Sequence, residues 1–284
     1  MRIKANAKIN LSLDITGKRP DGYHTLCSVF QSVSLSDELE ITLSDSTLVV
    51  CSDPTLSGEN NLCFKAAGMF FENTGLAGGA SIFINKHIPQ AGGLGGGSAD
   101  AAAVLFALNE LCGRPMTEEQ LLDTALCLGA DVPFCLKGGT RLCEGIGEKM
   151  TVLPSLPDCS IVIAKKGEKS STKEMYRELD NAVNLRHPDT DSMIRSLRSG
   201  ALAGALSGAY NCFESVCDKT ALSEARETAS QNSACYCGLS GAGPSVISVF
   251  ESLNNAAVTA DILAKKGFEA FVCRPAETGL EIID

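Results

Sequence analysis

Residues 89–102 read Pro-Gln-Ala-Gly-Gly-Leu-Gly-Gly-Gly-Ser-Ala-Asp-Ala-Ala, and this stretch restricts the fold most strongly. Its five glycines let the backbone turn sharply and come within hydrogen-bonding distance of a ligand. Ser98 and Asp100 are favoured helix N-caps, and the alanines beside and after them favour a helix. The sequence therefore predicts a loop that opens a helix at 98–112, whose free N–H groups and positive dipole end form an anion site.

This glycine loop, as we call residues 89–100, differs from the common phosphate-binding motifs. No Gly-Lys-Ser/Thr closes it as in a Walker A loop, and the sixth residue counted from Gly93 is Ser98, so GxGxxG fails. Neither Ser98 nor Ser240 completes the GxSxG of a nucleophile elbow. A flexible loop without a ligand is the plain alternative, but it is disfavoured because glycines are entropically costly and a helix cap needs only one of them.

The segments before and after the loop show a mixed pattern of strands and helices. Residues 9–15 alternate between apolar and polar, which predicts a half-buried strand with Lys8 and Asn10 on its polar face. Thr117 and Gln120 form a capping box that begins a second helix, which ends near Gly129. Further strands are expected at about 26–35, 38–43, 47–51 and 80–88, and a further helix at 61–73.

Pro154 and Pro157 mark the expected domain boundary, which divides the chain into residues 1–154 and 155–284. Strands with helices between them predict an α+β or α/β arrangement for the second part. Its helices are expected at about 172–179, 190–198, 219–230 and 255–266, and its strands at 160–164, 235–239, 245–250, 268–273 and 279–283.

Composition narrows the possible functions. The 284 residues suffice for one large or two ordinary domains, and the formal net charge of −10 argues against nucleic-acid binding. The 13 cysteines form no CxxC pair and only three histidines accompany them, so neither a disulfide framework nor a zinc site is expected. Residues 1–8 are too charged for a signal peptide, and no apolar run approaches the roughly 20 residues of a membrane span. Buried thiols and a cytoplasmic location are therefore expected.

Three motifs together resemble those of the GHMP kinases, a superfamily that includes galactokinase, homoserine kinase and mevalonate kinase. The first is Ala-Lys-Ile-Asn-Leu at 7–11 with Arg-Pro-Asp-Gly-Tyr-His at 19–24, the second is the glycine loop, and the third is Gly-Leu-Ser-Gly-Ala-Gly-Pro-Ser at 238–245. The segment Leu-Gly-Ala-Asp-Val-Pro-Phe at 128–134 also matches. The first motif is most similar to that of the members that phosphorylate 4-diphosphocytidyl-2-C-methyl-D-erythritol.

The resemblance implies an α+β, two-domain GHMP kinase fold, with an N-terminal ribosomal-protein-S5-like ATP-binding domain and a C-terminal ferredoxin-like domain. It implies transfer of the ATP γ-phosphoryl group to the 2-hydroxyl of the cytidine diphosphate-linked methylerythritol, in non-mevalonate isoprenoid synthesis. Mg²⁺ is expected because ATP is used as its Mg²⁺ complex. The expected partners are ATP and this small-molecule substrate, with no nucleic acid, membrane or obligate protein partner.

Two catalytic residues follow from the resemblance. Asp131 matches an aspartate that accepts the proton of the attacking hydroxyl, although its spacing alone suits a cap or turn residue before Pro133 equally well. Lys8 matches a lysine that orients this aspartate and stabilises charge on the transferred group. Without the motif, Lys8 would be a solvated surface lysine.

The resemblance also implies substrate-binding residues in three places. Tyr23 and His24 match a cytosine-binding pair that offers a stacking face and ring nitrogens, although a tyrosine in a Pro-Asp-Gly turn is otherwise often a turn anchor. Asn10 is expected to bond to the substrate hydroxyls. Thr172 is expected to bond to the diphosphate or sugar, and Tyr176 to supply a second aromatic face.

ATP is expected along the glycine loop and on both sides of it. Asn61 and Lys86 stand where the family contacts the adenine side. A turn in the third motif would support the loop or the phosphates through the N–H groups of Ser240, Gly241 and Gly243. No residue cluster announces a Mg²⁺ site, so phosphates, water and the Ser98 hydroxyl are expected to hold the ion. The expected loop contacts are Pro89, Gln90, Ala91, Gly92, Gly93, Leu94, Gly95, Gly96, Gly97, Ser98 and Ala99.

Other functions are disfavoured by particular features. Another GHMP kinase, of the homoserine or mevalonate type, does not explain the Asp-Gly-Tyr-His element at 21–24. A non-catalytic nucleotide or sugar sensor on the same fold does not explain the presence of both Lys8 and Asp131. A nucleic-acid-binding module with an S5-like domain conflicts with the net charge of −10.

Overall fold

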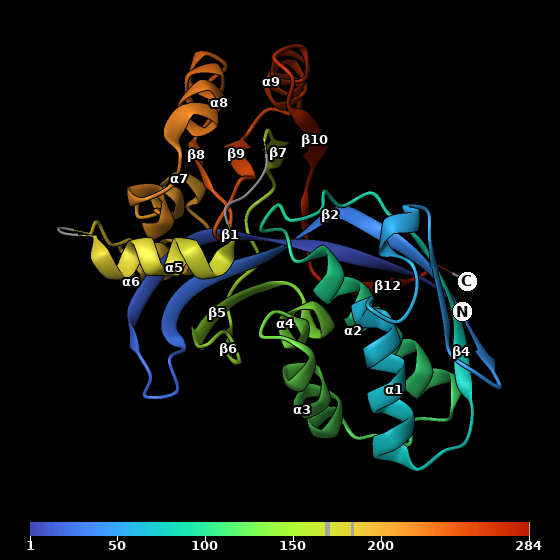
Figure 1. Ribbon diagram of the computed structural model, residues 1–284. Coiled ribbons are helices and arrows are strands. Elements are labelled where there is room, and N and C mark those ends of the chain that lie inside the picture. Colours follow the sequence, from blue (N-terminus) through green and yellow to red (C-terminus); the bar gives the residue numbers. More distant parts are fainter. Residues whose placement is uncertain (168–170, 183–184, 284) are drawn as a thin grey trace.

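The computed structural model describes residues 1–167, 171–182 and 185–283, which form two β-sheets with helices packed against them (Figure 1). In this part of the chain the large sheet has eight strands and the small sheet has four. Among the described residues, no helix is long and apolar enough to cross a membrane.

The large sheet is built on one long hairpin. Strand β1 (Arg2–Lys18) pairs antiparallel with β2 (His24–Ser44), with register shifts at three places where the ribbon bends. The sheet continues in the order β12-β1-β2-β4-β3, while β5 and β11 also pair with β2 and β6 pairs with β5. Its other strands are β3 (Leu48–Cys51), β4 (Gly79–Asn85), β5 (Thr140–Gly145), β6 (Lys149–Val152), β11 (Pro275–Ala276) and β12 (Leu280–Ile282).

Helices cover one face of the large sheet and bury α2 at the centre of the core. Residues of α2 from Ala99 to Leu108 pack against Ile3, Leu39 and Ile82 of the sheet. Because α2 is enclosed by this core, its first turn and the glycine loop before it are held in place. These helices are α1 (Leu62–Thr74), α2 (Gly96–Leu111), α3 (Glu118–Leu128) and α4 (Val132–Lys137), and a short 3₁₀ helix η1 (Pro54–Leu56) precedes α1.

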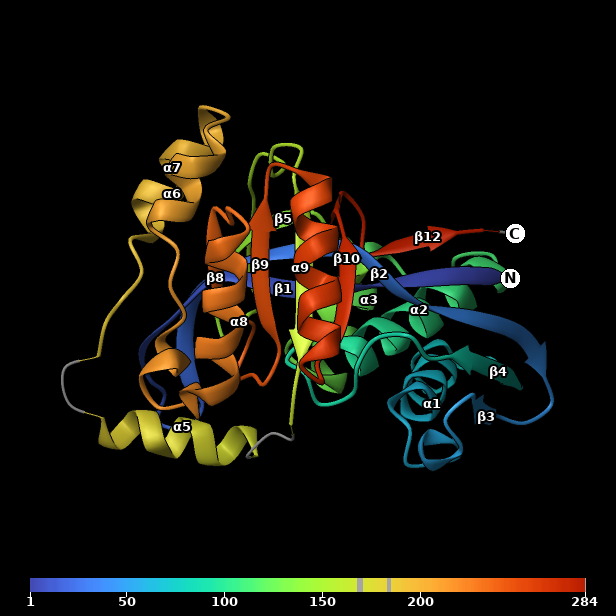
Figure 2. The same ribbon diagram turned by 90° about the horizontal axis from the view of Figure 1, so that it is seen from above.

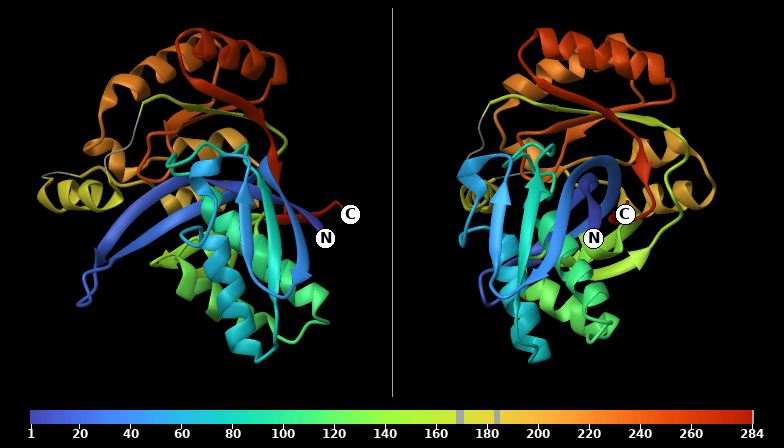
Figure 3. Two further views of the ribbon diagram at one scale, coloured as in Figure 1. Left: turned by 45° about the vertical axis from the view of Figure 1, so that its right-hand side comes forward. Right: turned by 90° about the vertical axis from the view of Figure 1, so that its right-hand side faces the viewer.

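The small sheet has the antiparallel order β10-β7-β9-β8, and α8 and α9 cover one of its faces (Figure 2). Its other face packs on the β1–β2 ribbon, where Ile161, Ile163 and Ile247 meet Ile9 and Leu11 (Figure 3). The elements are β7 (Ser160–Lys165), α5 (Thr172–Asn181), α6 (Thr190–Arg198), α7 (Leu202–Ser207), η2 (Cys212–Ser215), α8 (Lys219–Gln231), β8 (Tyr236–Leu239), β9 (Val246–Phe250), α9 (Leu253–Lys265) and β10 (Glu269–Cys273).

Most expected elements form within a few residues of their expected bounds, and the capping box of Thr117 begins α3 as predicted. The prediction that the first strand is half-buried is wrong, because Lys8 is only 4% exposed and Asn10 and Ser12 are 0% exposed. Their face of β1 lines an enclosed polar site instead of solvent. The strands expected at 26–35 and 38–43 are one strand, β2, and α4, β5, β6 and α7 were not expected.

The end of the chain returns to the large sheet. Strand β11 pairs with β2 and β12 pairs with β1, although both lie beyond residue 154. The strands between them and residue 154 form the small sheet. The expected division into residues 1–154 and 155–284 stays a proposal. Because of these pairings, we group residues 275–282 with the N-terminal part.

Candidate active site

The glycine loop leads from β4 into α2. Helix α2 begins at Gly96, with Gly95 as a left-handed N-cap at φ 70°, so neither Ser98 nor Asp100 serves as the cap expected from the sequence. Only glycine adopts this conformation easily, which moves the helix start toward the glycines. Because no side chain caps this end, the first N–H groups of α2 remain available to an anion.

A turn of residues 238–245 supports the glycine loop from the side of the small sheet. A Cβ added at Gly93, where φ is 77°, would lie 2.3 Å from the Ser240 carbonyl oxygen, so only glycine fits. The Ser240 hydroxyl donates to the Gly93 carbonyl (3.2 Å), and the Ser245 N–H donates to the Gly92 carbonyl (3.3 Å). This turn therefore contacts the loop directly, and its action on phosphates stays a prediction.

Asn10 connects β1 to the same turn. Its Oδ1 accepts hydrogen bonds from the Gly241 N–H and from Lys8 Nζ, each at 3.0 Å, and its Nδ2 donates to Ser28 Oγ at 2.9 Å. The Gly243 N–H closes the turn with a further backbone bond. Because the Asn10 amide already has partners on both of its atoms, its expected bond to the substrate stays a prediction.

Lys8, on β1, forms an ion pair with Asp131, the residue just before α4. Lys8 Nζ lies 3.4 Å from Asp131 Oδ2, and the two side chains are 5% and 35% exposed. The same Nζ lies 4.6 Å from the centroid of the Phe30 ring, a cation–π contact. Asp131 occupies the N-cap position of α4 but makes no capping hydrogen bond. The structure thus does not support the cap interpretation, and the carboxylate is directed to Lys8 instead.

Two cavities meet at the glycine loop. The first has a volume of about 920 Å³ and is lined by Lys8, Asn10, Asp131 and the expected substrate residues. The second has a volume of about 530 Å³ and is lined by the glycine loop with Asn61 and Lys86. Gly93 and Ser98 line both. A group held at the first turn of α2 can therefore reach both cavities.

The expected nucleoside-binding residues all line the first cavity. Tyr23 is 63% exposed, and Thr172 is the first residue of α5. His24 stacks on Tyr176 with ring centroids 4.7 Å apart and 19° between planes, and Tyr176 meets Phe213 edge-on at 5.1 Å. Tyr23, Thr172 and Tyr176 thus line one cavity, and their contacts with a base or a diphosphate stay a prediction.

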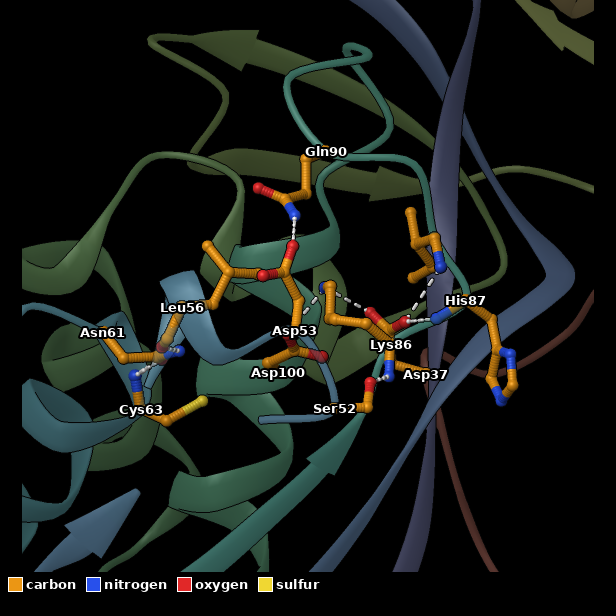
Figure 4. Close-up of polar contacts among 11 residues, drawn as sticks. Asp37, Ser52, Asp53, Leu56, Asn61, Cys63, Lys86, His87, Gln90 and Asp100 are labelled. Atoms are coloured by element: carbon orange, nitrogen blue, oxygen red, sulfur yellow. Dashed lines mark hydrogen bonds and ion pairs between the residues drawn. The ribbon is translucent and has the colours of Figure 1, made fainter. Parts of the chain in front are cut away.

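Lys86 belongs to a buried ion cluster with Asp37 and Asp100 (Figure 4). Its Nζ lies 2.5 Å from Asp37 Oδ2 and 2.8 Å from Asp100 Oδ2. Asp37 Oδ1 also accepts the N–H groups of His87 (2.6 Å) and Ile88 (2.9 Å), just before the glycine loop. Burial opposes ionisation, yet Asp100 and Asp37 hold the pKa of Lys86 above its usual value. Burial and Asp37 raise the pKa of Asp100. The ammonium expected near adenine is thus bound within the protein, and its contact with ATP stays a prediction.

Asn61 and Gln90 lie at the wall of the second cavity (Figure 4). Asn61 is the N-cap of α1, where its Oδ1 accepts from the Cys63 N–H (2.8 Å) and its Nδ2 donates to the Leu56 carbonyl (2.7 Å). Gln90 Nε2 donates to Asp53 Oδ2 (2.6 Å), which joins the glycine loop to the segment before η1. The sequence did not indicate that Asn61 shapes this wall as a cap, and its adenine contact stays a prediction.

Several residues of the site were not identified from the sequence. The clearest is Asp37, which is 0% exposed. It shares the apolar face of β2 with Leu39 and Ile41, because side chains two apart in a strand point the same way. A charged residue at such a core position is the signal that would have identified it. Phe30 and Asp180, which also line the first cavity, carry no local signal in the sequence.

Comparison with known proteins agrees with this geometry. The model of the GHMP kinases N terminal domain matches residues 61–139, and the model of the GHMP kinases C terminal domain matches residues 211–269. The 4-diphosphocytidyl-2-C-methyl-D-erythritol kinase of Clostridium acetobutylicum is 38% identical over 262 residues, 90% of this chain and 93% of that protein. The enzyme of the same name from Desulfitobacterium hafniense (strain Y51) is 40% identical over 278 residues, 97% of this chain and 96% of that protein.

The fold and the site are those of a GHMP kinase, a phosphotransferase that uses ATP, and the expected GHMP kinase fold is confirmed. A crystal structure of 4-(cytidine 5'-diphospho)-2C-methyl-D-erythritol kinase superposes with a TM-score of 0.81 at 30% identity, covering 97% of this chain and 99% of that one. The chain belongs to the family of the 4-diphosphocytidyl-2-C-methyl-D-erythritol kinases.

Proposed function

We propose that this chain transfers the γ-phosphoryl group of ATP to the 2-hydroxyl of 4-diphosphocytidyl-2-C-methyl-D-erythritol, a step of non-mevalonate isoprenoid synthesis. The observation that carries the proposal is that one cavity is lined by the Lys8–Asp131 pair, by Ser98 in the first turn of α2, and by Tyr23 and Tyr176. A phosphoryl donor site, a base and an aromatic site for a nucleoside therefore adjoin one another. Family membership supports the same reaction.

The two cavities suggest how the substrates meet. ATP would occupy the second cavity, with its phosphates at the free N–H groups of α2 and its γ-phosphoryl group directed past Ser98 into the first. Asp131 would accept the proton of the 2-hydroxyl as the new P–O bond forms and the bond to ADP breaks. Lys8 would hold this carboxylate and stabilise negative charge on the transferred group.

Mg²⁺ would enter with ATP as part of the substrate complex. Within residues 1–167, 171–182 and 185–283, no group of three or more His, Cys, Asp or Glu side chains is placed to hold a metal ion. We expect the ion to be held mainly by phosphates and water, with the Ser98 hydroxyl as the protein oxygen. The ion would neutralise charge on the β- and γ-phosphates.

An ADP-release assay with three acceptors tests the proposed function. We expect turnover with 4-diphosphocytidyl-2-C-methyl-D-erythritol and none above background with homoserine or mevalonate. Preference for homoserine or mevalonate would assign the chain a different reaction. Binding of ATP and the cytidine substrate without ADP release would make it a sensor.

Replacing Tyr23 with alanine tests the nucleoside end of the site. Loss of a stacking face worth about 1–3 kcal/mol should raise KM for the cytidine substrate roughly 5- to 150-fold. The kcat should change little, because stacking acts on the ground state and the transition state alike. Steady-state kinetics separate the two constants, and a loss confined to kcat would contradict this role.

We also propose that the enzyme works in the cytoplasm, in contact only with its small-molecule substrates. All 13 cysteines are free thiols, which suits a reducing compartment. Burial raises the pKa of Cys135, Cys143 and other enclosed thiols, which suits inert core residues.

A further inference from the structure

Asp180, in the last turn of α5, contacts both strands of the β1–β2 hairpin. Its Oδ2 lies 2.5 Å from Nζ of Lys18, the last residue of β1, and its Oδ1 lies 2.6 Å from Nε2 of His24, the first residue of β2. Tyr176, one turn earlier on α5, stacks on the His24 ring. Helix α5 therefore contacts the His24 ring in two ways: Tyr176 stacks on its face, and Asp180 bonds to Nε2 at its edge.

The contact with Asp180 determines which of the two ring nitrogens of His24 carries the hydrogen. Hydrogen bonds from Lys18 and His24 lower the pKa of Asp180, so its carboxylate is ionised and can only accept. Nε2 of His24 must then be the donor, and in the tautomer that carries its hydrogen on Nε2 the other nitrogen, Nδ1, is an acceptor. Within the described part of the chain Nδ1 has no hydrogen-bond partner, and His24 lines the first cavity beside Tyr23.

An acceptor at this place discriminates between pyrimidines. Cytosine carries an exocyclic amine, which donates hydrogen bonds, where uracil carries a carbonyl, which only accepts. A ring nitrogen that accepts is therefore complementary to cytosine and leaves a uracil carbonyl facing another acceptor. Sites built on one such hydrogen bond reject the analogue that lacks the donor.

We propose that Asp180 is a positioning residue that sets the preference for cytosine over uracil, by holding His24 with Nε2–H toward α5 and Nδ1 toward the base. This rests on the proposed function, because it takes the nucleoside end of the substrate to bind at Tyr23 and His24. Asp180 itself touches no substrate atom in this account. Lys18 is the second anchor, and it keeps the carboxylate oriented toward the hairpin.

The substitution Asp180→Asn reverses the pattern of donors at nearly constant shape. Lys18 has only donors, so the amide oxygen at position 180 should stay with it and the amide nitrogen should face His24. Nε2 must then accept, and the ring hydrogen moves to Nδ1. The site would offer a donor to the base, which suits the uracil carbonyl and not the cytosine amine.

Calorimetric titration of the full-length enzyme with CDP and UDP at pH 8 measures this preference without turnover. We expect the wild type to bind CDP more tightly than UDP. The Asp180→Asn variant should bind CDP about tenfold more weakly, the change of one hydrogen bond, and lose or reverse the preference. KM for ATP and the thermal midpoint should stay near the wild-type values. Glu178→Gln is the matched control, because it removes the same charge from an exposed position of α5 and should change none of these.

The outcomes separate this proposal from the proposed function. A wild type that does not distinguish CDP from UDP, or an Asp180→Asn variant that keeps the wild-type ratio, overturns the role of Asp180. An equal loss of ATP affinity in the variant also overturns it, since that would reveal a general disturbance. If the wild type discriminates and the variant does not, yet the ADP-release assay finds no kinase activity, the proposed function fails and the assignment of Asp180 stands.

Discussion

The variant Asp131→Ala is expected to lose about 10²- to 10⁴-fold in kcat while it binds ATP almost as well as the wild type. The carboxylate is the base expected to accept the proton of the attacking hydroxyl, and no described acidic side chain other than Asp131 lies within ion-pair distance of Lys8. Asp131 lines the first cavity and not the second, where ATP should bind. ADP release gives kcat, and calorimetry with ATP alone gives the affinity.

A matched control makes this result specific. Asp123→Ala removes the same side chain from an exposed position on α3, away from both cavities at the glycine loop, and should keep the wild-type kcat. The Asp131→Ala helix α4 should also stay folded, because the carboxylate makes no capping bond there. Wild-type turnover in Asp131→Ala would remove this residue from the base role.

Local patterns explain how much of the site the sequence could predict. The glycine loop is a contiguous signal, because glycines followed by helix formers specify a loop and a helix start within a few residues. Lys8 and Asp131 were paired only through the resemblance to a family, and the structure places them 3.4 Å apart. Alternation along residues 9–15 correctly identified the two faces of β1, but it could not show that the polar face is enclosed.

Long-range pairs explain most of what the sequence could not predict. Asp180 is 156 residues from His24 in the chain, and Gly93 is 147 residues from Ser240. No periodicity within one segment reports which distant segment lies opposite. Strands β5 and β6 were missed for a related reason: β5 forms by pairing with β2 and β6 by pairing with β5, and neither short segment has a strong strand pattern of its own.

The variant Asp37→Ala should lower the free energy of unfolding by about 3–5 kcal/mol, the usual cost of breaking a buried ion pair. The carboxylate is fully buried, and its removal leaves the N–H groups of His87 and Ile88 without their acceptor and Lys86 with one carboxylate instead of two. Urea unfolding followed by circular dichroism at 222 nm measures this loss, since the chain has no tryptophan.

Glu40→Ala is the control for Asp37→Ala, because it removes an exposed charge from the strand that carries the buried Asp37. Glu40 pairs with Arg2 at 3.3 Å, with side chains 59% and 46% exposed, so its removal should cost less than about 1 kcal/mol. Below the unfolding transition, Asp37→Ala should also raise KM for ATP, because the bonds to His87 and Ile88 hold the backbone that enters the glycine loop. A stability loss no larger than that of Glu40→Ala would mean that the cluster of Asp37, Lys86 and Asp100 does not anchor the loop.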